Sequence, residues 1–162
     1  VSPQNPHKKN DGTLEDEFSR LEMVKLAIAD EPGLSVCDVE FSLPKPSFTH
    51  EALRILRANN PETKFSIVAG SDTQRKIGRW RSSHEILMHH NIIVYPRVLT
   101  EKDRNWSLTP EVEASSTYLE NVPIIDISAT YIREQIQKNK SIRYLVPDSV
   151  IQYIKKNNLF KN

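Results

Sequence analysis

Glycine is scarce in this sequence. Its 162 residues include 4 glycines, where average usage would give about 11. They are Gly12, Gly33, Gly70 and Gly78, and no two lie close enough to form a glycine-rich loop. This spacing excludes a phosphate-binding G-x-x-x-x-G-K-S/T loop and a dinucleotide-binding G-x-G-x-x-G turn within these residues. A nucleotide bound by this chain must therefore be held by other groups.

Cysteine, surplus charge and long apolar runs are also lacking. The one cysteine, Cys37, cannot form an internal disulfide or a cysteine-based zinc site, so we expect a reducing, cytoplasmic environment. The 22 basic and 21 acidic residues give a net charge of +1, which does not favour nucleic-acid binding. No pair among the 5 histidines has H-x-x-x-H spacing, so no metal site is predicted. No apolar run approaches the roughly 20 residues of a membrane span, so no membrane association is expected.

Two apolar periodicities alternate along the chain. Helical spacing predicts helices from Thr13 to Pro32-Gly33, around Leu53, over 82–88 with a Ser82/Glu85 capping box, and over about 131–139 and 148–157. Short apolar runs predict strands over 34–41, 65–69, 91–95 and 124–127, whereas 97–120 is expected to be a long loop. This alternation is typical of α/β proteins, so we expect a Rossmann-like parallel sheet with helices on both faces. Ligands of such sheets bind at the carboxyl ends of the strands.

The strongest local pattern is I-S-A-T-Y-I-R at residues 127–133, at a predicted strand-to-helix junction. Ser128 and Thr130 place hydroxyl groups at a helix start, where backbone N–H groups lack helical acceptors, and Arg133 follows one turn later. These groups together could bind an anion. Ordinary helix capping explains the same pattern and is the more common reason for it.

Two further segments contain residues suited to ligand binding. Asp72, in Gly70-Ser71-Asp72, could accept hydrogen bonds from a ribose or orient a metal-bound water, or it could cap a turn. Trp80 lies between Arg79 and Arg81, which suits either stacking on a charged heterocycle or packing in the core. Spacing does not separate these alternatives.

Residues near Val1 form a polar, proline-containing segment that could close over a phosphate. It contains His7 and Lys8, directly after Asn5-Pro6. Composition alone favours a terminal segment without such a role.

The sequence resembles the nicotinate-nucleotide adenylyltransferases of the nucleotidyltransferase α/β-phosphodiesterase superfamily, from Val1 nearly to Lys161. Seven motifs occur in the family's order, which is far more specific than any one alone. With the family pattern in parentheses, they are residues 2–8 (P-P-H-K), 20–23 (R-x-x-M), 46–49 (P-S-Y-T), 70–72 (G-A-D), 78–80 (P-K-W), 127–133 (I-S-S-T-x-I-R) and 141–147 (S-I-R-Y-L-V-P).

The resemblance implies adenylyl transfer from ATP to nicotinate mononucleotide, giving deamido-NAD and pyrophosphate in NAD biosynthesis. Magnesium would accompany ATP, and no covalent enzyme intermediate is needed, so the protein would position two anions and neutralise developing charge. Assembly into a homo-oligomer is left open.

The resemblance also assigns roles to individual residues. Those that would contact ATP are Ser128, Thr130, Arg133, Gly70 and Asp72. Those that would contact the pyridine nucleotide are Trp80, which would stack on the nicotinate ring, and Phe48, Thr49, His7 and Lys8.

The sequence departs from the family pattern in three places. Ala129 replaces a serine, which removes one hydroxyl, and Ser71 replaces an alanine. The family's G-S/T-F-D-P-x-H-x-G-H stretch, with its catalytic histidines, is not present. We therefore expect a βα unit of roughly 30 residues before Val1, and residues 1–162 to be a single, N-terminally incomplete nucleotidyltransferase domain.

Two alternatives stay open at this point. One is a related adenylyltransferase acting on nicotinamide mononucleotide or pantetheine phosphate, although a flexible pantetheine arm would gain little from stacking on Trp80. The other is a nucleotide-binding domain without catalytic activity.

Overall fold

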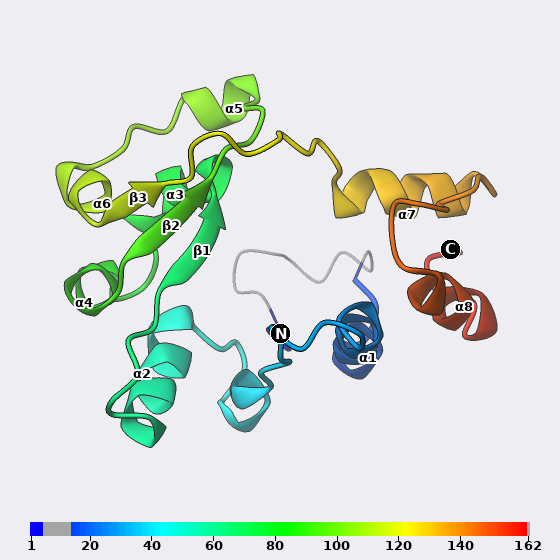
Figure 1. The fold of residues 1–162 in the computed structure, drawn as a ribbon, viewed down its shortest axis with the longest axis horizontal. Coiled ribbons are helices and arrows are strands. Elements are labelled where there is room, and N and C mark those ends of the chain that lie inside the picture. Colours follow the sequence, from blue (N-terminus) through cyan, green and yellow to red (C-terminus); the bar gives the residue numbers. More distant parts are fainter. Residues whose placement is uncertain (5–13, 162) are drawn as a thin grey trace. The chain divides into compact units, whose positions relative to one another are not determined.

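The computed structural model describes residues 1–4 and 14–161 (Figure 1). The chain divides into two compact units, residues 1–47 with 127–162 and residues 48–126. Each unit is described by itself below. The expectation that residues 1–162 form a single domain stays a prediction.

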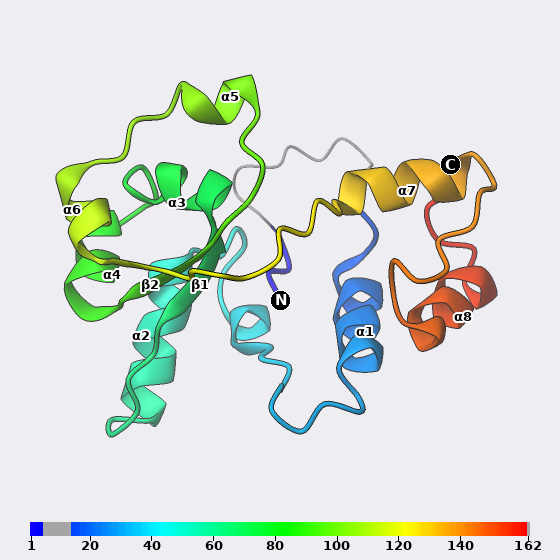
Figure 2. The ribbon, with the colours of Figure 1, turned by 45° about the horizontal axis from the view of Figure 1, so that its top comes forward.

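The unit of residues 48–126 is built on a parallel sheet of three strands (Figures 1 and 2). The strands are β1 (Ile67–Gly70), β2 (Ile92–Tyr95) and β3 (Ser116–Tyr118), in the order β1-β2-β3. Ile67 pairs with Ile92, and Ile92 pairs with Ser116. The helices of this unit are α2 (Thr49–Asn59), α3 (Ser71–Ile77), α4 (Ser83–His89), α5 (Glu101–Arg104) and α6 (Pro110–Ala114). The expected class, an α/β fold with a parallel sheet, is confirmed.

The core of this unit lies on one face of the sheet. Ala69, Ile92 and Val94 from the strands pack with Ile77 of α3 and Val112 of α6. Because side chains alternate along a strand, the residues between them face the opposite side. The packing of α3 against β1 and β2 fixes the strand-to-helix junction after Gly70, which is the predicted ligand-binding edge.

The other unit is helical. It contains α1 (Glu17–Ala27), the short 3-10 helix η1 (Val39–Ser42), α7 (Ala129–Gln137) and α8 (Asp148–Lys156). Its buried core consists of Ile142, Val150, Ile154 and Leu159. The N-terminal and C-terminal segments are joined within this unit, because Ser149 Oγ donates to Leu26 O (3.1 Å) and the Phe160 N–H to Glu15 Oε1 (2.6 Å).

Both α7 and α8 end in a Schellman motif with asparagine in the left-handed conformation. Asn139 has φ 53°, its N–H donates to Ile136 O (2.9 Å), and the Lys140 N–H donates to Gln135 O (2.8 Å). Asn158 also has φ 53°, and the Leu159 N–H donates to Ile154 O (3.1 Å). Asparagine thus takes the position that glycine most often occupies at helix ends, in a chain that has few glycines.

The predicted strand over residues 34–41 is wrong. The backbone bonds locally instead, since the Phe41 N–H donates to Asp38 O (2.8 Å) and the Leu43 N–H to Glu40 O (3.2 Å), which forms η1. A strand needs a neighbour to pair with, and the described strands all pair within the sheet of the other unit.

The predicted long loop over residues 97–120 is also wrong, because it contains α5, α6 and β3. Threonine caps begin both helices: Thr100 Oγ1 accepts from the Asp103 N–H (3.3 Å), and Thr109 Oγ1 from the Val112 N–H (3.5 Å), with Pro110 in the first turn. Such short helices carry too few apolar residues to show a period.

Three smaller expectations also differ from the structure. The apolar run 124–127 forms no strand, and the third strand is instead the polar β3. Helix α1 begins at Glu17, capped by Asp16, whereas Thr13 lies outside the described residues. Ser82 makes no side-chain cap, because its backbone is left-handed (φ 53°). The other predicted helices and the strands around 65–69 and 91–95 are confirmed. In the described part of the chain, every helix is too short or too polar to cross a membrane.

Candidate nucleotide-binding site

The start of α7 presents hydrogen-bond donors and hydroxyl groups on an exposed surface. Ser128 is the N-cap residue, and its Oγ accepts from the Tyr131 N–H (3.1 Å). The neighbouring first-turn N–H groups of Ala129 and Thr130 have no acceptor within the helix by geometry. No acidic residue occupies this first turn, so the positive end of the helix dipole is not neutralised by its own helix.

Arg133 lies against the same helix start. Its Nη2 donates to Thr130 Oγ1 (3.2 Å), which holds the guanidinium beside the first turn of α7. Ser128 and Thr130 are exposed, and Arg133 is half-buried. The structure therefore brings together the three residues predicted to hold phosphates, and it also shows Ser128 acting as a helix cap. The two explanations are compatible, because a cap uses one N–H and leaves the others available.

A second group of candidate residues lies at the carboxyl end of β1. A Cβ atom on Gly70 would overlap Asp72 Oδ1 and lie 2.6 Å from Arg97 Cδ, so any larger residue would displace one of these side chains. Asp72 Oδ1 is buried and accepts no hydrogen bond among the described residues. Its nearest cation is Arg97, whose Nε lies 3.9 Å away. An unsatisfied carboxylate oxygen at this edge of the sheet is suited to a ligand donor or a cation.

Arg97 joins this group although it was not among the predicted site residues. It follows β2, and Ser71 Oγ accepts from the Arg97 N–H (3.0 Å) and donates to the Arg97 carbonyl (3.4 Å). This exchange attaches the end of β2 to the first residue of α3. The signal available in the sequence was its position, since Arg97 comes just after the strand predicted over 91–95, at the ligand-binding edge.

Trp80 is half-buried and packs against the core of its unit. Its backbone lies in the turn after α3, where the Trp80 N–H donates to Ile77 O (2.9 Å). The guanidinium of the neighbouring Arg79 lies over the ring of Trp106, with Cζ 4.1 Å from the ring centre. Core packing therefore explains the partial burial of Trp80, and its stacking on a nicotinate ring stays a prediction.

Phe48 and Thr49 lie at the start of α2, in the same unit as Trp80. The Phe48 N–H donates to Glu51 Oε2 (3.2 Å), and Arg81 Cζ lies 4.6 Å from the centre of the Phe48 ring. Residues 48 and 81 are therefore adjacent in space, as expected if the P-S-F-T and G-R-W segments border one pocket.

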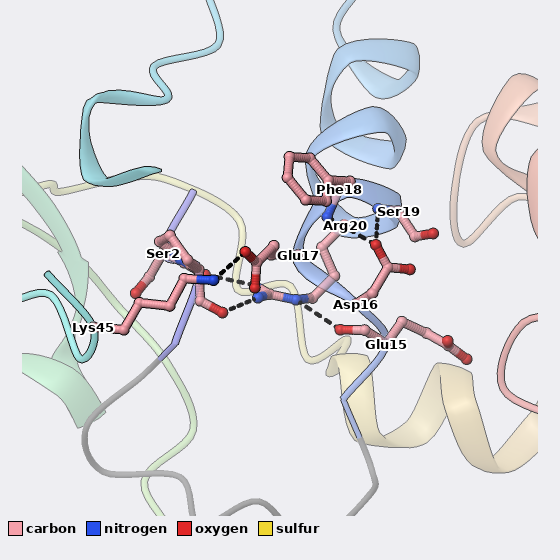
Figure 3. Close-up of polar contacts among 9 residues, drawn as sticks. Ser2, Glu15, Asp16, Glu17, Phe18, Ser19, Arg20 and Lys45 are labelled. Atoms are coloured by element: carbon pink, nitrogen blue, oxygen red, sulfur yellow. Dashed lines mark hydrogen bonds and ion pairs between the residues drawn. The ribbon is translucent and has the colours of Figure 1, made fainter. Parts of the chain in front are cut away.

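Arg20, in the R-x-x-M segment, binds backbone carbonyl groups near Val1 and directly before α1 (Figure 3). Its guanidinium donates to Ser2 O (2.7 Å) and Pro3 O (2.6 Å), and its Nε to Glu15 O (3.1 Å). Lys45 pairs with Glu17 beside it. Arg20 thus holds residues 2 and 3, directly before the segment with His7 and Lys8, which lie outside the described residues.

An ion pair fastens α3 to α5. Lys76 Nζ lies 2.9 Å from Asp103 Oδ1, and Thr100 Oγ1 donates to Asp103 Oδ2 (2.6 Å). The Thr100 hydroxyl and then the Lys76 ammonium lower the pKa of Asp103 from 3.8 to about 2. The carboxylate is therefore ionised at neutral pH and stabilises the helix whose first turn contains Asp72.

The described residues contain no cluster of three or more His, Cys, Asp or Glu side chains able to hold a metal ion by themselves. Asp72 is the carboxylate at the sheet edge that could contribute one ligand. A magnesium ion commonly needs only one or two protein carboxylates when phosphates supply the other oxygens.

Comparison with known proteins identifies the class of protein to which this chain belongs. Residues 1–135 match the family described as cytidylyltransferase-like, a class of nucleotidyltransferases. The probable nicotinate-nucleotide adenylyltransferase of Flavobacterium psychrophilum is 38% identical over 161 residues, covering 99% of this chain and 81% of that protein. The corresponding protein of Cytophaga hutchinsonii is 40% identical over 162 residues, covering 100% and 81%. The chain belongs to the nicotinate-nucleotide adenylyltransferases of the cytidylyltransferase-like family, as the resemblance of its motifs had indicated.

Solved structures agree on the fold. Plasmodium falciparum nicotinic acid mononucleotide adenylyltransferase, complexed with NaAD, superposes with a TM-score of 0.68 at 20% identity, covering 94% of this chain and 78% of that one. The same enzyme complexed with APC gives a TM-score of 0.67 at 19% identity, covering 91% and 77%.

Proposed function

We propose that this protein transfers the adenylyl group of ATP to nicotinate mononucleotide, giving deamido-NAD and pyrophosphate in NAD biosynthesis. The observation that carries the proposal is the 38–40% identity to nicotinate-nucleotide adenylyltransferases over essentially the whole chain. The donor-rich start of α7 supports it, since the reaction brings two phosphate-bearing substrates together.

In the reaction, a phosphate oxygen of nicotinate mononucleotide attacks the α-phosphorus of ATP. A new P–O bond forms, the bond between the α-phosphorus and the bridging oxygen breaks, and pyrophosphate leaves with the electron pair. The entering and leaving groups are both anions, so catalysis depends on holding them in line and neutralising charge.

The residues of this chain supply positioning. Ser128 and Thr130, the free N–H groups of α7 and Arg133 would bind ATP phosphates. Gly70 leaves room for the side chains of Asp72 and Arg97 at the end of β1, where Gly70 and Asp72 would contact the nucleotide. His7 and Lys8 would contribute to binding the second phosphate.

The pyridine nucleotide would be bound by Trp80, stacked on its ring, with Phe48 and Thr49 beside it. The proximity of Phe48 to Arg81 supports this placement, because Arg81 is the neighbour of Trp80. The guanidinium of Arg81, near the bound pyridine ring, would also favour a pyridine that carries a carboxylate.

Magnesium bound to the ATP phosphates would neutralise charge on the departing pyrophosphate. The unsatisfied Asp72 Oδ1 supports a protein ligand or water contact to such an ion. The lone Cys37, which is exposed, is consistent with the proposed cytoplasmic location. Whether copies of the protein assemble stays open.

Pyrophosphate release by the purified full-length protein tests the proposal. With ATP and magnesium, we expect turnover with nicotinate mononucleotide to exceed that with nicotinamide mononucleotide or pantetheine phosphate. Preference for either of these would assign the related adenylyltransferase activity instead. Binding of ATP without turnover of any of the three would indicate a nucleotide-binding domain without catalysis.

A further inference from the structure

A cavity of about 610 Å³ lies between the end of α7, the following turn and α8, entirely within one unit. Its volume is in the range of small-molecule pockets, roughly 300–1,000 Å³. None of Ser128, Thr130 and Arg133 lines it. Those residues lie at the opposite end of α7, whose nine residues span about 13 Å.

The rim of this cavity is strongly cationic. Four basic side chains line it, which are Lys140, Arg143, Lys155 and Lys161, against the single carboxylate of Asp148. Among the described residues, no carboxylate forms an ion pair with Lys140, Arg143 or Lys155. Like charges gathered without counter-charges repel one another, and a bound anion would relieve that repulsion.

The floor of the cavity is apolar. It is formed by isoleucines at 136, 142, 151 and 154, which belong to the hydrophobic core of the unit or pack against it. Ile142 and Ile154 are buried, so this floor is fixed by the core. An apolar floor beneath a cationic rim suits a ligand with an apolar body and an anionic group.

The backbone around the cavity is also fixed. The Schellman motif at the end of α7 sets the direction of Lys140, and the one at the end of α8 sets the segment that leads to Lys161. Lys161 Nζ donates to Asn158 Oδ1 (2.9 Å), and the Arg143 N–H to Ser141 Oγ (3.2 Å). Ordered turns therefore fix the backbone from which Lys140 and Lys161 extend.

We propose that this cavity binds an organic phosphate whose apolar body rests on the isoleucines and whose phosphate contacts Lys140, Arg143 and Lys155. The site is separate from the proposed adenylyl-transfer site and goes beyond that activity. Lysines near helix C-termini can also serve only to complement the helix dipole. Lys156 separates the two explanations, because it shares the last turn of α8 with Lys155 but does not line the cavity.

Calorimetric titration of the full-length protein with 1-naphthyl phosphate tests the proposal. The double variant Lys140→Glu/Lys155→Glu should weaken binding about tenfold or more, the equivalent of about 1.4 kcal/mol. The control is Lys138→Glu/Lys156→Glu, which makes the same change of net charge at residues that do not line the cavity; it also removes the exposed Lys138–Glu134 pair (3.8 Å), which contributes little. It should change the affinity less than about threefold. Thermal unfolding of both double variants verifies that each is folded.

Two further titrations complete the test. Inorganic phosphate should bind about tenfold more weakly than 1-naphthyl phosphate, because it cannot use the apolar floor. Arg133→Ala should leave 1-naphthyl phosphate binding unchanged. Equal weakening by the two double variants, equal affinity for the two phosphates, or loss of binding only in Arg133→Ala would each overturn the proposal.

Discussion

At the scale of single residues, Arg133 is half-buried, donates a hydrogen bond to Thr130 and lies outside the buried core of its unit. Arg133→Ala is therefore expected to weaken ATP binding about tenfold while changing the melting temperature little, because a charge-assisted contact to phosphate contributes about 1.5–3 kcal/mol. Calorimetric titration with ATP and thermal unfolding measure the two effects. Lys138→Ala, at the C-cap of α7, is the control. Unchanged ATP affinity with a lower melting temperature would show that Arg133 serves only the helix.

The lowered pKa of Asp103 predicts that its contribution to stability depends on pH. Its pKa is lowered from 3.8 to about 2 in the folded protein, so its contribution to stability is complete above the unfolded pKa and is lost as the pH falls through the folded one. The difference in unfolding free energy between wild type and Asp103→Asn should therefore shrink as the pH falls from about 4 to about 2. Denaturant unfolding at several pH values measures it, with Glu101→Gln on the same helix as the control. A difference that stays constant over this range would contradict the assignment.

At the scale of elements, the ends of α7 and α8 depend on left-handed asparagines. Asn139→Gly should raise the unfolding free energy by about 0.5 kcal/mol, because glycine adopts this conformation without the strain of a Cβ atom. Asn157→Gly is the matched control: its φ is −98°, and its side chain donates to Tyr153 O (2.9 Å), so it should lower stability. Denaturant unfolding compares the two. Destabilisation by Asn139→Gly would show that the asparagine side chain, and not backbone strain, decides this position.

The sequence allowed some elements to be predicted and not others, for physical reasons. The strands around Ile67 and Ile92 were predictable because they are buried and apolar. β3 was not, because it is a polar strand of three residues whose place is set by pairing with β2. The prediction for residues 34–41 was wrong for the opposite reason. The side-chain pattern suits a strand, but the backbone forms hydrogen bonds between near neighbours in the sequence.

The candidate site was predictable where its geometry is local. Ser128, Thr130 and Arg133 lie within six consecutive residues at the start of α7, so their spacing alone predicted that they lie close together. The contacts of Arg97 with Ser71 and Asp72 span 26 and 25 positions and depend on the packing of parallel strands, which no local spacing reveals.

At the scale of the whole molecule, the family resemblance was more informative than any element. It rests on seven motifs spread over both units, and the matching relatives cover essentially the whole chain. The hydrophobic pattern of the sequence alone would have predicted only an α/β protein, because a parallel sheet supports many activities.

The contact at Gly70 also has a consequence for motion. Ser71 and Arg97 exchange two hydrogen bonds, and the space over Gly70 is filled by the side chains of Asp72 and Arg97. These contacts join the end of β2 to the start of α3, so we expect the two segments to move together. We therefore expect residues 70–72 and 97 to keep their mutual positions when a ligand binds at this edge, with the Asp72 carboxylate already beside Arg97.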